Sequence, residues 1–256
     1  MKRSLSAIAV TAALLFIATS GRAQQEITLI APNIVDDPIK ELAKAFEAKT
    51  GIKVNPTIGA VVASKDRVIK GEPFDVPIVE VPYDVEAIKS GNVVPNSATA
   101  LCNIALGVAV RKGAPKPDIS TPEAVKRTFL AAKSIAHVNP NPNGAASGIA
   151  ATEAIQKLGI AEQLKSKITM GNGGARTMAM VANGQAEIGM TLLPGMDDPG
   201  IDIVGPLPRE VSPPIVVIGF VSAHAKDPSA AKQLLTFLSS PDAAAIYKKF
   251  RMQPGR

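Results

Sequence analysis

The sequence predicts an α/β fold of two lobes, each a mostly parallel sheet flanked by helices. Strand and helix patterns alternate along most of the chain, which is typical of parallel sheets. Two long apolar runs, at 100–110 and 215–222, suit two strands that cross from one lobe to the other. We therefore expect a discontinuous first lobe, residues 24–104 with 216–256, and a second lobe, residues 105–215.

The first 23 residues have the features of a signal peptide. Lys2 and Arg3 give a positive start, residues 7–18 form an apolar run, and Gly21-Arg22-Ala23 ends in small residues. The apolar run is short for a membrane span, although a membrane anchor is the alternative interpretation. We expect export to the periplasm and a mature chain that begins at Gln24.

Composition narrows the classes of function. The net charge is +6, and it falls to +3 without Lys2, Arg3 and Arg22; the remaining charges are scattered along the chain. Neither binding to nucleic acid nor electrostatic binding to a membrane surface is therefore expected. Cys102 is the only cysteine, which excludes an intramolecular disulfide. Without Trp, stacking of a sugar on an indole ring is excluded.

The first lobe begins with a β-α-β-α-β pattern. Strands are predicted at 26–31, 52–58 and 75–81, and the last of these is strongly apolar. Asp37 is the expected N-cap of the first helix, with Pro38 at its first position and Gly51 at its end. A second helix is predicted between the turn 59–64 and Gly71.

The rest of the chain continues the alternation. Further strands are predicted at 135–138, 164–170, 186–192 and 201–207, beside the two crossing runs. Further helices are predicted at 122–130, 147–158, 174–181, 228–238 and 241–250. Neither an internal repeat nor a low-complexity segment is present.

The stretch 134–159 is the most informative one for function. An apolar strand leads into the Asn- and Pro-rich loop 139–144, and Ser147-Gly148 then opens a helix. The start of a helix has unpaired N–H groups and favours negative charge, so this arrangement suits an anion. Asn141 and Asn143 either line a cleft or cap the loop. An ordinary loop with a Ser cap is the alternative.

The order of these features resembles the type II periplasmic solute-binding proteins of ABC transporters, and most closely their molybdate-binding group. The resemblance is carried by residues 38–54 (P-I-K-E-L-A-K-A-F-E-A-K-T-G-I-K-V), 71–76 (G-E-P-F-D-V) and 230–243 (A-A-K-Q-L-L-T-F-L-S-S-P-D-A). It implies two lobes joined by two crossover strands, with a ligand in the cleft between them. It also implies a monomer that delivers its ligand to a membrane permease.

In that family an oxyanion is held by hydroxyl groups and by backbone N–H groups at helix starts. The corresponding donors here are the side chain of Asn33, the backbone at Ala60 and Val61, the start Ser147-Gly148, the pair Gly173-Gly174, and Thr191. The turn at 59–62 has no hydroxyl, so only its backbone can donate. Because unpaired buried oxygens are costly, and because Arg176 could bind a carboxylate through two hydrogen bonds, we expect an organic carboxylate rather than a metal oxyanion. Molybdate or tungstate is the alternative.

No catalytic or metal-binding constellation is recognised in the sequence. His137 is expected in the core and His224 on a surface loop, while Asp197 and Asp198 are expected in an exposed turn. Neither Ser64 nor Ser147 lies in a nucleophile elbow. We therefore expect a protein without enzymatic activity, metal or cofactor that captures a small anion for an ABC importer. A secreted sensor is the alternative, and an exported hydrolase is a third.

Overall fold

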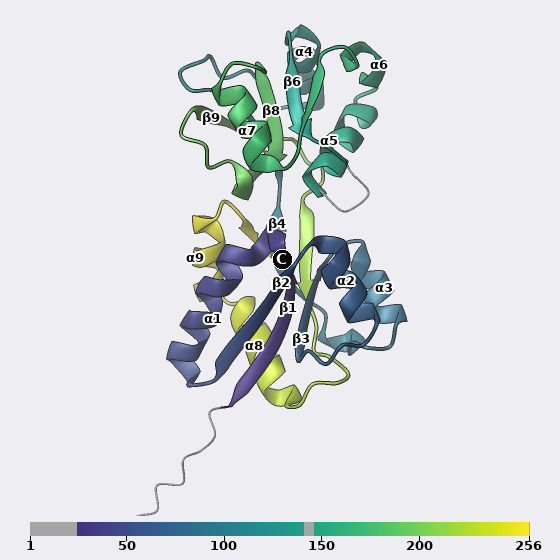
Figure 1. Cartoon of the computed structure of the whole chain (residues 1–256), viewed down its shortest axis with the longest axis vertical. Helices are drawn as coiled ribbons and strands as arrows, with labels where there is room; N and C mark the ends of the chain where they lie inside the picture. Colours follow the sequence, from purple (N-terminus) through teal and green to yellow (C-terminus); the bar gives the residue numbers. More distant parts are fainter. Residues whose placement is uncertain (1–24, 141–145, 256) are drawn as a thin grey trace, which may run out of the picture.

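The computed structural model describes residues 25–140 and 146–255, which form two sheets with helices packed against them (Figure 1). The predicted signal peptide, as well as Asn141 and Asn143, lies outside the described residues. None of the helices in the described part of the chain has the length and apolar character needed to cross a membrane.

The first sheet has six strands in the order β11-β4-β10-β3-β1-β2. They are β1 (Glu26–Pro32), β2 (Lys53–Gly59), β3 (Val76–Glu80), β4 (Thr99–Ile104), β10 (Ile215–Gly219) and β11 (Gln253–Pro254). The helices between or after these strands are α1 (Asp36–Thr50), α2 (Val61–Ile69), α3 (Tyr83–Lys89), α8 (Pro228–Leu238) and α9 (Pro241–Lys249).

The second sheet has five strands in the order β7-β6-β8-β5-β9. They are β5 (Leu106–Arg111), β6 (Ile135–Val138), β7 (Ile168–Gly171), β8 (Ile188–Leu192) and β9 (Ile201–Pro206). The accompanying helices are α4 (Pro122–Ala131), α5 (Ala146–Lys157), α6 (Ala161–Leu164) and α7 (Gly174–Ala182). The two sheets and their helices lie one above the other in Figure 1.

Both sheets are mixed, so the prediction of mostly parallel sheets is wrong in part. Strands joined through helices are parallel, namely β1 with β2 and β3, and β6 with β7 and β8. The strands next to the connections between the sheets, β4, β5, β9 and β10, form antiparallel pairs. The alternation of strand and helix in the sequence therefore accounts only for the parallel half of each sheet.

The first crossing is confirmed and the second is corrected. Residues 99–111 contain β4 in one sheet and β5 in the other, with a break at Ala105. The apolar run at 215–222 does not cross, because β10 pairs only with β3 and β4 of the first sheet. The return is made by the segment 207–214 between β9 and β10. The predicted lobe boundaries stay a prediction.

The beginning of α1 differs from the prediction, and its end agrees with it. Asn33–Val35 forms a 3-10 turn that runs directly into α1, so the helix begins at Asp36 with Val35 as its N-cap, and Asp37 is not the cap. Pro38 is still tolerated because the first N–H groups of a helix have no intrahelical partner. Gly51 ends the helix in the left-handed conformation, at φ 74°.

Candidate functional site

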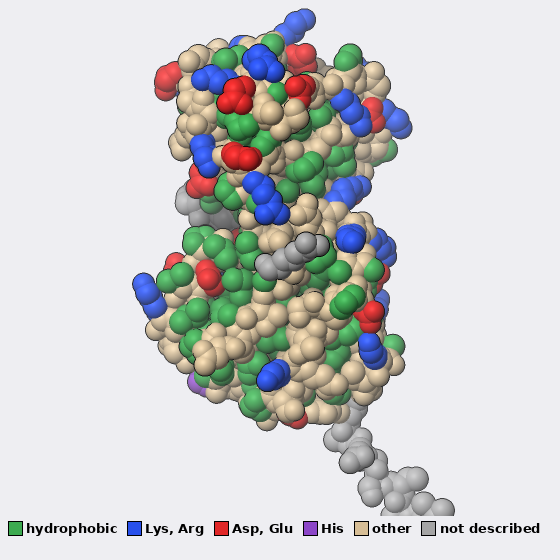
Figure 2. Space-filling view, turned by 180° about the vertical axis from the view of Figure 1, so that it is seen from behind, with side chains coloured by type: hydrophobic (Ala, Val, Ile, Leu, Met, Phe, Trp, Pro, Cys, Tyr) green, Lys and Arg blue, Asp and Glu red, His purple; other side chains and the backbone are tan. Residues whose placement is uncertain are grey.

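The two sheets enclose a cavity of about 820 Å³, called the main cleft here. The first sheet and its helices contribute residues 33, 34, 36–38, Val61 and 249–252, and the second contributes residues 146–147, 174–175 and several from 191–198. Figure 2 shows the narrowing of the molecule between its two halves, where Lys, Arg, Asp and Glu side chains are intermixed on the visible face. A ligand in the main cleft would contact both halves of the protein.

Three helices, α2, α5 and α7, begin at the main cleft, through Val61, Ala146 and Gly174. Among the described residues, no Asp or Glu lies in the first turn of any of them. The N-caps of α2 and α7, Ala60 and Gly173, provide no side-chain hydrogen bond. The first N–H groups of these helices are therefore donors directed at one space, and the helix dipoles favour an anion there.

The lining of the main cleft also includes charged residues of both signs, namely Asp36, Asp37, Asp197, Asp198, Lys249 and Arg251. Asp36 and Asp37 occupy the first turn of α1, and Asp36 pairs with Lys40 at 2.8 Å. Across the cleft, Asp197 pairs with Arg251 at 2.7 Å, which joins the two halves of the molecule. Carboxylates repel an anion, so the starts of α2, α5 and α7, whose first turns have no acidic residue among those described, are the favourable position for a negative ligand.

Close packing fixes the starts of α5 and α7 on the second sheet. A Cβ atom at Gly148 would lie 2.6 Å from the carbonyl oxygen of Val138, so the first turn of α5 rests on the end of β6. A Cβ atom at Gly174 would lie 2.9 Å from Oγ1 of Thr191, at the end of β8. Glycine at both positions lets the helix N–H groups approach the ends of the strands.

Five of the predicted ligand-binding residues line the main cleft and four do not. Asn33, Val61, Ser147, Gly174 and Thr191 are lining residues, and Thr191 is buried. The four others are Ala60 and Gly173 at the N-caps, Gly148 buried in α5, and Arg176, which is exposed on α7. Their contact with a ligand stays a prediction.

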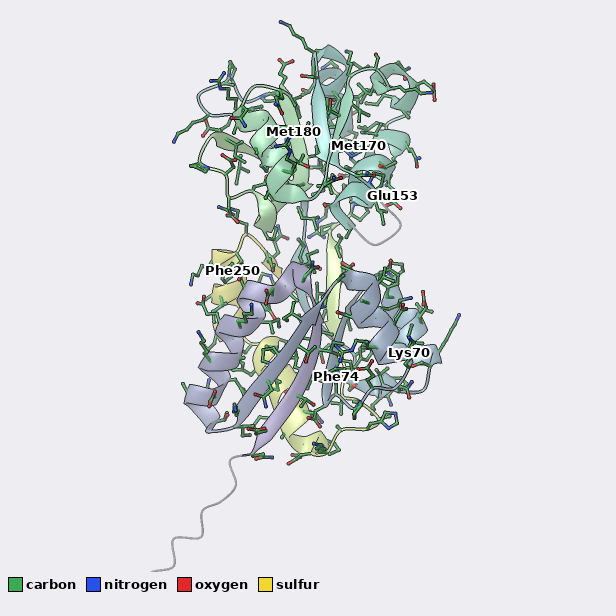
Figure 3. The ribbon with its side chains drawn as sticks, viewed as in Figure 1. Lys70, Phe74, Glu153, Met170, Met180 and Phe250 are labelled. Carbon is green, nitrogen blue, oxygen red and sulfur yellow. The ribbon has the colours of Figure 1, made fainter. Side chains whose placement is uncertain are left out.

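A second cavity of about 530 Å³, called the side cavity here, adjoins the main cleft. Both cavities are lined by Val61 and Ala146, the first residues of α2 and α5. The side cavity is mostly apolar and extends to the segment 211–216. In Figure 3, Phe250 of the main cleft and Glu153 of the side cavity lie on opposite sides of the long axis.

Glu80 is the polar residue of the side cavity that the sequence analysis missed. It ends β3, is only 3% exposed, and its Oε2 has no hydrogen-bond partner among the described residues. Burial raises the pKa of this carboxyl from 4.5 to about 7. The signal in the sequence was an acidic residue within the otherwise apolar run 76–81, followed by Pro82.

The remaining polar candidates have structural roles. His137 is buried in β6, as predicted, with its Nδ1 2.8 Å from the carbonyl oxygen of Val138, and burial lowers its pKa. His224 is exposed and lies 2.9 Å from Oδ1 of Asn92. The hydroxyl of Ser64 donates to the carbonyl oxygen of Ala31. Within the described ranges, no cluster of three or more His, Cys, Asp or Glu could hold a metal ion.

The sequence matches a known protein family over most of its length. Residues 27–252 match the family of bacterial extracellular solute-binding proteins. The chain belongs to this family. The main cleft of this solute-binding protein lies between its two sheets, where the resemblance seen in the sequence implies a ligand.

Two characterised relatives have different names. An aconitate isomerase of a Pseudomonas species is 31% identical over 235 residues, which cover 89% of this chain and 87% of the relative. The molybdate-binding protein ModA of Azotobacter vinelandii is 29% identical over 255 residues, which cover 98% of each chain. The family thus includes proteins named for a tricarboxylate and for an oxyanion.

Solved structures agree with the fold. The substrate-binding domain assigned to a molybdenum ABC transporter of Clostridium difficile superposes with a TM-score of 0.78 at 18% identity, covering 90% of this chain and 98% of that one. The sulfate-binding protein SubI of Mycobacterium tuberculosis superposes with a TM-score of 0.64 at 17% identity, covering 90% of this chain and 87% of that one. Both have the fold of this solute-binding protein, and the likeness extends no further than the fold.

Proposed function

We propose that this protein captures a small organic polycarboxylate in the periplasm and delivers it to the permease of an ABC importer. The observation that carries the proposal is the meeting of α2, α5 and α7 at one cavity, each with a first turn free of acidic residues among those described. These starts supply N–H donors and a favourable dipole for one carboxylate group.

Two features favour a carboxylate over molybdate. The hydroxyl of Ser64, in the first helix after β2, is bonded to the carbonyl oxygen of Ala31 and is not available to an oxyanion. The mostly apolar side cavity continues from the same helix starts and suits a carbon chain, which a tetrahedral oxyanion lacks. The relative named aconitate isomerase adds support for a tricarboxylate.

Charge placed at the start of α5 tests the capture site. Ser147 is the second residue of α5 and lines the main cleft, and Ser229 is the second residue of α8, remote from it. In Ser147→Asp the new carboxylate stabilises the helix by about 0.3–1 kcal/mol and repels a bound anion. We expect calorimetry to show binding of aconitate or citrate weakened at least tenfold in Ser147→Asp, and unchanged in the control Ser229→Asp.

Binding of molybdate, tungstate or sulfate with no binding of aconitate or citrate would refute the choice of a carboxylate. Equal binding by both Asp variants would refute the site. Uptake of the labelled ligand by cells with and without this gene distinguishes delivery to an importer from sensing, because both roles share the capture step.

A second function, isomerisation of the bound ligand, is favoured by the relative named aconitate isomerase together with the unpaired carboxyl of Glu80. In this function the protein interconverts the cis and trans forms of an unsaturated tricarboxylate. No catalytic constellation is recognised in the sequence, and Glu80 is the group that would supply one. Conversion of cis-aconitate to its trans isomer by the purified protein, followed by NMR, tests this function.

A further inference from the structure

Glu80 has no structural role that its contacts explain. Its Oε2 lacks a hydrogen-bond partner among the described residues, although the side chain is 97% removed from solvent. Asp75, the residue before β3, is also buried, but its carboxylate has partners. It accepts hydrogen bonds from the N–H and hydroxyl of Thr28 and from the N–H of Lys226. An unpaired buried carboxyl destabilises a protein, so a functional reason for Glu80 is the economical explanation.

The side cavity brings Glu80 close to the place where an anion is held. Val61 and Ala146 line both cavities, so a carboxylate at the starts of α2 and α5 lies at their junction. The carbon chain of such a ligand can then extend into the side cavity, whose wall includes Glu80. The same molecule can thus present one end to the helix N–H donors and its CH₂ groups to the Glu80 carboxyl.

Few other polar groups face the side cavity. Tyr83 comes from α3, Ser212 from the segment that returns to the first sheet, and Glu153 and Lys157 from α5. Glu153 and Lys157 are exposed, whereas Glu80 is buried. Burial makes Glu80 the group of this cavity that changes its protonation near neutral pH, which suits proton transfer.

We propose that Glu80 is a catalytic residue that moves a proton along the carbon chain of an unsaturated polycarboxylate bound across the two cavities. The inference rests on the proposed function, because the substrate must first be held at the helix starts. It assigns a reaction to a cavity and a residue that the capture of a ligand does not require.

The step is an allylic proton shift, for which no oxidant or reductant is needed. The Glu80 carboxylate takes a proton from the CH₂ group next to the double bond, and that electron pair forms the new C=C bond. The former π electrons move to the far carbon, which takes a proton from the Glu80 carboxyl after that carboxyl has exchanged its proton with solvent. In aconitate the product has the same constitution, with either geometry at the new double bond. The helix starts stabilise the negative charge that develops on the substrate carboxylate.

Exchange in D₂O measures this step directly. The purified protein is incubated with cis-aconitate, and ¹H NMR follows loss of the CH₂ signal and appearance of the trans isomer. The saturated analogue tricarballylate, which has no allylic position, measures binding by calorimetry. We expect Glu80→Gln to slow exchange at least ~100-fold and to change tricarballylate affinity by less than about threefold. Glu153→Gln removes the exposed carboxylate of the same cavity and allows the two carboxylates to be compared. Glu162→Gln, at an exposed residue of α6 that lines neither cavity, should retain exchange.

Each other outcome overturns a defined part of the argument. Tricarballylate binding by the unchanged protein without exchange of aconitate overturns this inference and leaves the capture function standing. No binding of any tricarboxylate overturns the capture function as well. Loss of exchange in Glu153→Gln, with exchange retained in Glu80→Gln, overturns the assignment to Glu80. A circular dichroism spectrum of each variant establishes that it is folded.

Discussion

The ionisation of Glu80 should make the stability of this protein depend on pH in a way that one substitution removes. The carboxyl is buried without a partner among the described residues, and its pKa is raised from 4.5 to about 7 in the folded chain. The folded protein therefore binds this proton more tightly than the unfolded chain does. Stability from this source is complete below pH 4.5 and is lost as the pH rises to about 7.

The size of the effect follows from the shift. A change of one pKa unit corresponds to 1.36 kcal/mol, so the shift at Glu80 corresponds to about 3 kcal/mol. Glutamine has a similar shape and cannot ionise. We expect Glu80→Gln to match the unchanged protein near pH 4 and to exceed its unfolding free energy by about 3 kcal/mol at pH 8.

Urea denaturation followed by circular dichroism, at several pH values between 4 and 8, measures this difference. Other groups titrate equally in both proteins, so their contributions cancel in the comparison. Glu153→Gln is the matched control, because Glu153 is exposed and its loss should give no pH-dependent difference. A difference between Glu80→Gln and the unchanged protein that stays constant with pH, or lower stability of Glu80→Gln at pH 8, would refute the argument that this carboxyl is desolvated and unpaired.

Two further substitutions test other contacts. Tyr247 is 1% exposed and its hydroxyl has no partner among the described residues. Tyr247→Phe should therefore leave the unfolding free energy unchanged or raise it by about 1 kcal/mol. A lower unfolding free energy in urea denaturation would contradict this. In Gly174→Ala the new Cβ lies 2.9 Å from Oγ1 of Thr191, so either the start of α7 or that hydroxyl must move. We expect calorimetry to show an affinity for the carboxylate about tenfold lower. Unchanged affinity would show that α7 is not part of the site.

Elements with a clear apolar pattern between Gly or Pro residues could be predicted from the sequence. β6 and α8 have the predicted bounds, 135–138 and 228–238. The helix α3 was missed because its only buried residue is Ala87, while Val85 and Ile88 are exposed, so it has no apolar face to recognise. Hydrophobic periodicity finds helices that bury a face, and α3 buries almost none.

The order and direction of the strands in each sheet were harder to predict from the sequence. An apolar run such as 215–222 indicates burial, but burial does not say which sheet the strand joins or in which direction. β10 pairs with β3 and β4, which are more than 100 residues earlier in the chain. Such pairing depends on tertiary contacts, and single-sequence patterns carry little information about them.

The candidate site also contains some residues that the sequence indicates and others that it does not. The strand-loop-helix pattern correctly indicated that Ser147 and Gly174 lie at helix starts, whereas Val61, predicted in the turn 59–64, is the first residue of α2; the structure brings all three to one cavity. Glu80 could not be found in this way, because its raised pKa results from burial by segments that are distant in the sequence. These segments include Ile149 and Ser212. Local sequence specifies where donors occur, whereas desolvation of a carboxyl is a property of the folded chain.

The two measurements on Glu80→Gln together separate a structural role from a functional one. A buried group retained for packing or hydrogen bonding lowers stability when it is replaced, and any loss of activity then follows from the damaged fold. For Glu80 we expect the opposite combination, namely higher stability and lost activity on replacement, because its Oε2 has no hydrogen-bond partner among the described residues. A variant that is more stable at pH 8, binds tricarballylate and no longer exchanges aconitate would show that the chain carries this carboxyl at a cost in stability for its chemistry. Lower stability together with unchanged exchange would instead make Glu80 an ordinary part of the core.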